Sequence, residues 1–123
     1  MHKTKVVQDK HRYIGASVLE LAKLPVYEML YEYCKEKWGD DVDLCMTDTD
    51  SLLLMIKGKD VYKDIAADMH ERFDTSNYPK DHPSGIEVCV NKKVPGMWKD
   101  ESAGQEIVEY AAARPKCYDI FLF

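Results

Sequence analysis

One stretch of the chain, residues 43–56, restricts the possible folds more than any other. Two apolar runs of strand length flank a short polar tip with two carboxylates, and the stretch reads DLCMTDTDSLLLMI. This pattern predicts two strands joined by a tight turn. Asp48 and Asp50 are two residues apart, so on an extended chain both side chains point the same way and could face one cation. Carboxylate oxygens on a rigid support suit Mg²⁺, which takes one or two carboxylates and keeps several waters.

The same tip also has an interpretation without any ligand. Asp, Thr and Ser are ordinary turn residues, and a DxD after an apolar run is a weak signal by itself. The tip is therefore either an Asp/Ser-rich β-turn or a metal site. The remainder of the chain has to distinguish these two interpretations.

Length and composition indicate one modest globular domain. The chain has 123 residues, of which 46% are hydrophobic and 32% charged, as in ordinary soluble segments. No apolar run approaches the ~20 residues of a membrane span, and no signal-peptide pattern follows Met1. We therefore expect no membrane partner and an intracellular protein that is not secreted, nuclear or cytoplasmic according to its host. The net charge of −5 argues against a general nucleic-acid coat but not against an acidic metal site.

Two helices are predicted on either side of the central stretch. The first spans residues 16–38, where Ser17 begins a capping-box pattern. Pro25 lies inside this helix and should kink or divide it. The second spans residues 60–73, and Asp60 is placed to cap it.

The last third of the chain predicts short strands after an irregular loop rich in proline. Turn signals at Pro95-Gly96 and Ala103-Gly104 separate the strands. The predicted strands lie within residues 87–123 at 87–90, 94–99, 107–112 and 116–123, and residues 1–123 are predicted to form a single, partial domain. We expect an α+β fold with a mostly antiparallel sheet and helices packed on one face.

A second group of interest is the segment Arg114-Pro115-Lys116-Cys117-Tyr118. Proline biases Arg114 toward an extended conformation, and from there Lys116 and Tyr118 would alternate onto one face of a strand. A cation beside a phenol can bind a phosphate and pack against a sugar or base. A surface lysine beside a half-buried tyrosine explains the same residues without a ligand.

Taken together, four separated segments resemble the protein-primed family-B DNA polymerases of phages, linear plasmids and large DNA transposons. The TDTDSL segment is similar to motif C, the palm hairpin with catalytic aspartates, and RPKCY is similar to the K-x-Y motif that steadies the primer terminus. The other two segments resemble the palm helix before motif C and a transposon-type insertion. In chain order the four are residues 13–15 with 18–24, residues 47–52, residues 77–83 with 91–94, 96 and 99–101, and residues 114–118.

The resemblance implies a polymerase palm and nucleotidyl transfer by a two-metal mechanism. In that mechanism one cation activates the primer 3′-hydroxyl and the other stabilises the triphosphate and the leaving pyrophosphate. Asp50 would be the direct ligand of Mg²⁺, with Mn²⁺ as a substitute. Asp48 would tune the site or contact the metal transiently, while Thr49 and Ser51 would fix the turn.

The resemblance also assigns DNA contacts and partners. Lys116, Tyr118 and Arg114 would bind the primer strand. The implied partners are a DNA primer-template, a deoxynucleoside triphosphate and a terminal priming protein. The remaining polymerase subdomains would be missing or supplied by another chain, so we expect an incomplete DNA-directed DNA polymerase.

The chain departs from the family pattern in several places. Residues 111–113 are three alanines where a bulkier residue and a glycine are usual, and Asp119 replaces a small polar residue. Pro25 interrupts a helix that should be continuous. We find no motif A to supply a partner aspartate and no finger motif for the nucleotide. A truncated palm would expose apolar surface, which predicts self-association.

Two other functions remain open at this point. One is a polymerase-derived nucleic-acid-binding module that has lost catalysis. The other is a phosphatase of the haloacid-dehalogenase type, whose nucleophile also lies in a DxD after a hydrophobic strand. Here the residues after the second aspartate are Ser51 and Leu52, whereas that family prefers a Gly-Thr or similar pair.

Overall fold

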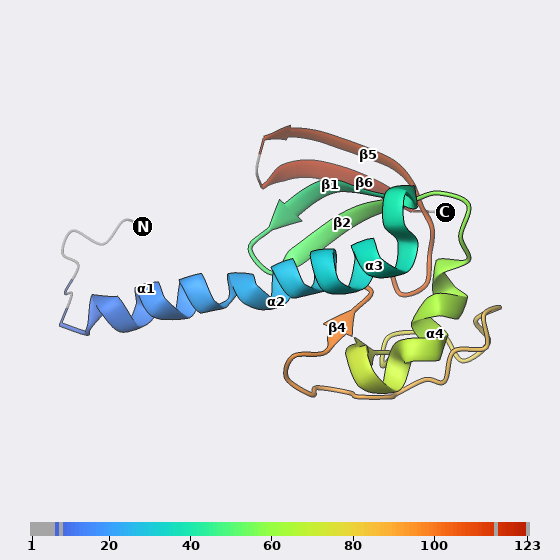
Figure 1. Ribbon diagram of the computed structural model, residues 1–123, viewed down its shortest axis with the longest axis horizontal. Helices are drawn as coiled ribbons and strands as arrows, with labels where there is room; N and C mark the ends of the chain where they lie inside the picture. The colour runs from blue at the N-terminus through green and yellow to red at the C-terminus, as the bar shows by residue number, and fades with distance from the viewer. Residues whose placement is uncertain (1–6, 8, 115, 123) are drawn as a thin grey trace.

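The computed structural model describes residues 7, 9–114 and 116–122. Residues 12–41 form a helical rod whose N-terminal end extends away from the body of the molecule (Figure 1). The rod consists of four consecutive helical segments that lead into a short 3₁₀ turn. They are α1 (Arg12–Leu21), α2 (Lys23–Tyr27), a π-helical segment (Glu28–Cys34), α3 (Lys35–Trp38) and the 3₁₀ turn (Gly39–Asp41).

The rod differs from the predicted first helix in its starting residue and in the role of Ser17. It begins at Arg12, before the predicted cap, and the Ser17 hydroxyl donates a hydrogen bond of 2.8 Å to the Tyr13 carbonyl inside α1. Ser17 is therefore an interior residue and not a cap. The helix divides at Ala22, and Pro25 falls in the first turn of α2, where its missing N–H leaves no helical bond unmade.

The central stretch forms an antiparallel hairpin, as its sequence predicts. Strand β1 (Val42–Asp48) pairs with β2 (Ser51–Ile56), with Asp48 opposite Ser51 at the turn and a bulge at Cys45. Helix α4 (Val61–Arg72) follows, and the Asp60 carboxylate accepts a hydrogen bond of 3.3 Å from the Lys63 N–H as its N-cap.

The segment after α4 is mostly irregular, contrary to the prediction of a strand at residues 87–90. Strands β3 (Phe73–Asp74) and β4 (Trp98–Lys99) form a short parallel pair. Between them, fully buried Thr75 donates to the Glu87 carbonyl at 2.6 Å and accepts from the Val90 N–H at 3.1 Å. These bonds hold residues 87–90 in turns, and the predicted strand over 94–99 is reduced to β4.

The chain ends in a second antiparallel hairpin, formed by β5 (Ile107–Arg114) and β6 (Cys117–Leu122). The described strands thus form three two-stranded sheets and not one larger sheet. The fold is mixed α+β with small antiparallel sheets, which agrees with the predicted class. The expectation of a single sheet with helices packed on one of its faces is not met.

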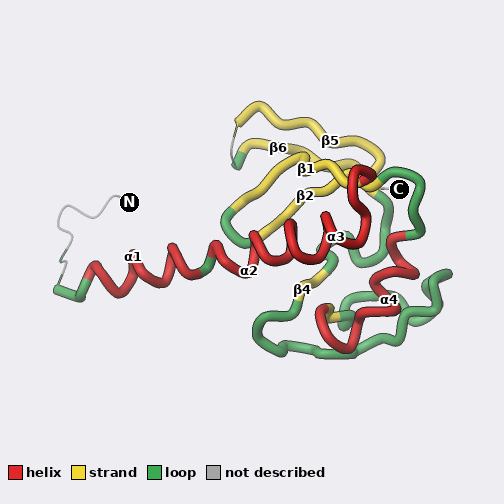
Figure 2. Tube along the Cα trace, viewed as in Figure 1, coloured by secondary structure: helices red, strands yellow, loops and turns green. Residues whose placement is uncertain are grey.

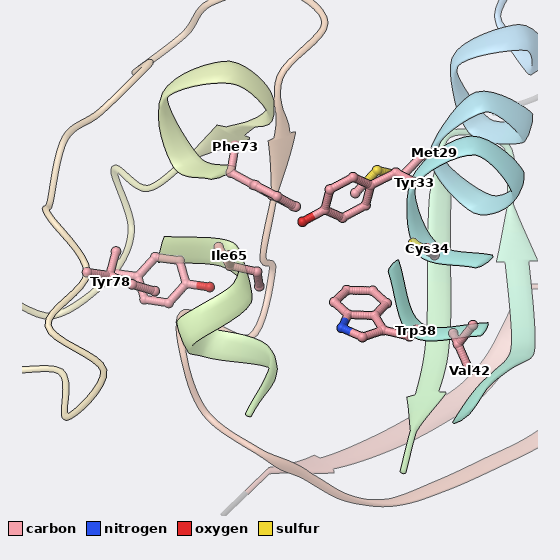
Figure 3. Close-up of a cluster of buried hydrophobic side chains, with 9 residues drawn as sticks. Met29, Tyr33, Cys34, Trp38, Val42, Ile65, Phe73 and Tyr78 are labelled. Atoms are coloured by element: carbon pink, nitrogen blue, oxygen red, sulfur yellow. The ribbon is translucent and has the colours of Figure 1, made fainter. Parts of the chain in front are cut away.

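A single cluster of buried side chains joins the C-terminal half of the rod to β1, α4 and the irregular segment (Figure 3). Tyr33 lies at its centre, in edge-to-face contact with Trp38 and Phe73 at centroid distances of 5.7 Å each. Polar groups at the rim are paired: the Tyr33 hydroxyl donates to Asp68 at 2.7 Å, and the Trp38 indole donates to Asp64 at 2.7 Å. The cluster consists of Met29, Tyr33, Cys34, Trp38, Val42, Ile65, Phe73, Tyr78 and Ile86.

Two elements project from this body without contributing a buried residue. Helix α1 buries none of its side chains, and the β5–β6 hairpin has only Tyr110 and Ile120 half-buried (Figure 2 shows both elements). Both expose large apolar side chains, for example Leu21 at 62% and Val108 at 66%. Among the described helices, none has the length and apolarity that crossing a bilayer requires.

Candidate functional site

The turn between β1 and β2 is tight, and its side chains are fixed by local hydrogen bonds. Thr49 has a φ of 58°, which is strained for a β-branched residue, and the Asp50 N–H donates to the Asp48 carbonyl at 2.7 Å. The Ser51 hydroxyl donates to the same carbonyl at 3.0 Å, and the Thr49 hydroxyl donates to the Asp48 carboxylate at 3.1 Å. The sequence TDTDS therefore builds a rigid tip with one carboxylate oriented by its neighbour.

The turn of the second hairpin reaches this tip. The Lys116 ammonium donates a hydrogen bond of 2.7 Å to the Asp48 carboxylate, across 68 residues of sequence. The Asp48 side chain is 23% exposed and the Lys116 side chain 72%. The bond from Lys116 holds the pKa of the Asp48 carboxyl below its usual range, and the bond to Asp48 raises the pKa of the Lys116 ammonium.

Asp50 lies in the turn, exposed, and its carboxylate accepts no hydrogen bond from the described residues. Its negative charge also raises the pKa of Lys116, so it contributes to the same electrostatic site. The sequence prediction placed Asp48 and Asp50 on one extended chain, where side chains two residues apart point the same way. Asp50 lies outside both strands, so this rule does not apply to the pair. The turn, and not strand geometry, places these two carboxylates.

Lys116, from the predicted group at residues 114–118, lies at this tip, but its predicted position on a strand was wrong. Lys116 occupies the β5–β6 turn with a φ of 61°, so it does not share a strand face with Tyr118 as predicted. Arg114 is exposed at the end of β5, opposite Cys117. Pro115 lies outside the described residues.

Beside the Lys116 turn, the hairpin carries an open hollow of about 450 Å³. Tyr118, 43% exposed, forms one wall of this hollow. The alanine side chains at residues 111–113 are small and leave this space open. A bulkier side chain at one of these positions would fill it. The lining residues are Ala111, Ala112, Ala113, Cys117, Tyr118 and Asp119.

The donor set at the tip consists of two carboxylates, whose oxygens are of the type that a hydrated divalent cation takes. Asp48 and Asp50 supply carboxylate oxygens, and Mg²⁺ is commonly held by one or two carboxylates with waters completing its shell. Within the described part of the chain, no group of three or more His, Cys, Asp or Glu side chains is arranged around a common point. A cation at the tip would also have to compete with the Lys116 ammonium for Asp48.

Sequence reasoning did not foresee the ion pair between Asp48 and Lys116. It identified both residues, in separate motifs, but no local pattern signals a contact between two turns 68 residues apart. No local pattern signals the contacts of His82 either. In the structure the His82 ring contacts the Ser84 hydroxyl at 2.6 Å and the Gly104 carbonyl at 3.1 Å, so it joins two loops of the irregular segment.

A comparison of the chain with protein-family models, with curated proteins and with solved structures finds no match.

Proposed function

We propose that this chain is part of the palm of a protein-primed family-B DNA polymerase, with its metal site at the tip of the β1–β2 hairpin. One observation carries the proposal: the turn with Asp48 and the turn with Lys116 meet at 2.7 Å. The polymerase resemblance requires motif C and the K-x-Y motif to serve one site, and the contact between the two turns supports that arrangement.

The proposed chemistry follows from the groups at the tip. Asp50, exposed and without a partner among the described residues, would be the principal metal ligand, and Asp48 would join it when Lys116 moves away. Bound Mg²⁺ supplies Lewis-acid activation of a 3′-hydroxyl and charge neutralisation of a triphosphate. Thr49 and Ser51 hold the turn in place, which keeps the carboxylates positioned before any ligand arrives.

The K-x-Y side of the site would bind the primer strand. Lys116 already contacts Asp48 at the tip and would contact a phosphate, while Tyr118 offers an aromatic face beside the alanine-lined hollow. Arg114, exposed at the same end of the hairpin, would add a second phosphate contact. The partners in this proposal are a primer-template, a deoxynucleoside triphosphate and a priming protein.

The exposed apolar surfaces support a role as one part of a larger assembly. Ten large apolar or aromatic side chains of α1 and of the β5–β6 hairpin are 40–67% exposed, and exposed apolar surface of this kind often marks a site of protein contact. Other polymerase subdomains would cover these surfaces and supply the aspartate of motif A. Activity of the chain alone is therefore not expected.

Metal binding tests the proposal directly. Titration of the purified chain with Mg²⁺ by calorimetry, or with Mn²⁺ by electron paramagnetic resonance, should show binding at millimolar concentrations that Asp50→Asn removes. Asp43→Asn is the matched control, because Asp43 lies on the same hairpin but pairs with Lys57 at 2.9 Å. An absence of binding at millimolar metal, or equal binding by Asp50→Asn, would refute the metal site.

A second candidate is a catalytically inactive nucleic-acid-binding module. The ion pair between Lys116 and Asp48 supports it, because this pair occupies a carboxylate that a metal would need. This candidate predicts salt-sensitive DNA binding that Lys116→Ala abolishes, together with no metal binding at the tip. The phosphatase alternative gains no support, because the DxD lies in the turn of an antiparallel hairpin. Fluorescence anisotropy with labelled DNA at two salt concentrations measures the DNA binding that both candidates predict, and the metal titration above separates the two.

A further inference from the structure

The β5–β6 hairpin is attached to the body in an unusual way. Its fourteen strand residues, 107–114 and 117–122, include none that is buried. The half-buried pair Tyr110 and Ile120 are register partners on adjacent strands, so the hairpin has a single partly buried patch. The β1–β2 hairpin, by contrast, contributes fully buried Val42 to the core cluster.

The chain that leads into this hairpin is fixed to the body up to residue 105. The His82 ring contacts the Gly104 carbonyl at 3.1 Å, and the Gly104 N–H donates to Asp100 at 3.0 Å. The Tyr62 hydroxyl donates to the Gln105 carbonyl at 3.1 Å. Strand β5 begins two residues later at Ile107, so a change in hairpin position would be absorbed around residue 106.

Beyond that point, one hydrogen bond connects the described hairpin residues to the rest of the molecule. It is the bond from Lys116 to Asp48 at the far end of the hairpin, 2.7 Å long. The two hairpins lie beside each other with their turns at the same end (Figure 1), yet no ladder hydrogen bonds join them. The lysine is mostly exposed, and an exposed ion pair of this kind opens readily and is weakened by salt.

We propose that the β5–β6 hairpin is a hinged arm that pivots at residue 106, and that the Asp48–Lys116 pair is the clasp that closes it over the acidic tip. In the closed position the ammonium neutralises Asp48. Opening the arm releases one carboxylate on β1 and one ammonium on the arm. The arm and its clasp do not depend on the function proposed above, because they follow from attachment and burial alone.

Distance measurements by double electron–electron resonance test the clasp in the intact chain. One spin label is placed on the arm at Ala113→Cys and the other on the exposed face of α4 at Ala67→Cys. The exposed cysteines, which are Cys45, Cys89 and Cys117, are changed to serine, while buried Cys34 is retained. The parent protein at low salt should give one narrow distance distribution.

Three changes define the expected result. Lys116→Met should add a broad population at longer distances, and 1 M NaCl should do the same to the parent but not to this variant. Lys57→Met is the matched control: it breaks another exposed ion pair, between Lys57 and Asp43 on the body, and should leave the distribution narrow. The charge exchange Asp48→Lys with Lys116→Asp should restore the narrow distribution.

The proposal is overturned by any of three outcomes. An unchanged distribution in Lys116→Met would mean that packing alone fixes the hairpin. Equal broadening in Lys57→Met would show that the effect is not specific to the clasp. A failure of the charge exchange to narrow the distribution would exclude an ionic clasp. Circular dichroism melting of each variant shows whether the body has stayed folded.

Discussion

The body of the molecule differs from its two projecting elements, helix α1 and the β5–β6 hairpin, in how many side chains it buries. In the body, the C-terminal half of the rod, β1, α4 and the irregular segment enclose one continuous cluster with its polar rim groups paired. Helix α1 and the β5–β6 hairpin have regular secondary structure but bury no side chain. The comparison shows that tertiary packing is concentrated in the body, while the projections depend on local hydrogen bonds and offer their apolar faces outward.

The largest expected effect is the loss of stability when the body core is truncated. Trp38→Ala removes an indole that is 6% exposed and bonded to Asp64, and should lower the free energy of unfolding by about 3–5 kcal/mol. Leu21→Ala on α1, where the side chain is 62% exposed, should change it by less than about 0.5 kcal/mol. Urea unfolding measures both. Equal effects would mean that α1 packs as the body does.

The next effect concerns the loops that form the base of the arm. A Cβ at Gly104 would lie 2.6 Å from the His82 ring, and its φ of 83° already disfavours a side chain. Gly104→Ala should therefore cost about 2–3 kcal/mol. Gly58→Ala has a comparable φ of 63° but open space around it, and should cost about 1 kcal/mol. Thermal melting compares the two variants, and equal costs would contradict the steric contribution of His82.

A smaller effect is expected at the rim of the body core, and it depends on pH. Hydrogen bonds from Lys37 and then Tyr33 hold the pKa of Asp68 below its usual value. A carboxyl with a depressed folded-state pKa contributes stability above its unfolded pKa of about 3.9 and loses it as the pH falls through the folded value.

Asp68→Asn should therefore lower the free energy of unfolding at pH 7 by about 1 kcal/mol. It should also flatten the decline in stability below about pH 4. Asp43→Asn, which removes one partner of an exposed ion pair, should have a smaller effect at pH 7. Urea titrations at several pH values measure these differences, and a parallel acid decline in Asp68→Asn and the parent would refute this role.

The smallest effect on folding, but a clear effect on association, is expected on α1. Val18 is 60% exposed and Leu21 62%. Val18→Gln with Leu21→Gln should leave the unfolding midpoint nearly unchanged, because neither side chain loses a buried contact. The pair should reduce the self-association that exposed apolar surface favours. Sedimentation velocity measures this, and a parent that is monodisperse and monomeric would contradict it.

The sequence predicted those elements whose signals lie within a few neighbouring residues. The apolar runs around the DxD tip gave the β1–β2 hairpin, and Asp60 gave the start of α4. The prediction of a strand at residues 87–90 was wrong, because the Thr75 hydroxyl, which donates to the Glu87 carbonyl and accepts from the Val90 N–H, holds that segment in turns.

The candidate site shows the same limit. The sequence identified Asp48 and Lys116 through two separate motifs, and their family assignment and function stay predictions. It could not show that the two charges meet, because nothing in either turn specifies the position of the other. Nor could it show that the strands would separate into three small sheets, since pairing partners across a sheet are set by the whole chain.

The contact between the two turns also has a consequence for the order in which the chain folds. Sixty-eight residues separate Asp48 from Lys116, and closing so long a loop costs chain entropy that one exposed ion pair does not repay. Folding of helix α4 and the irregular segment shortens this loop, so we expect both to fold before the turns of the two hairpins come into contact. We therefore expect docking of the C-terminal hairpin to come late in assembly.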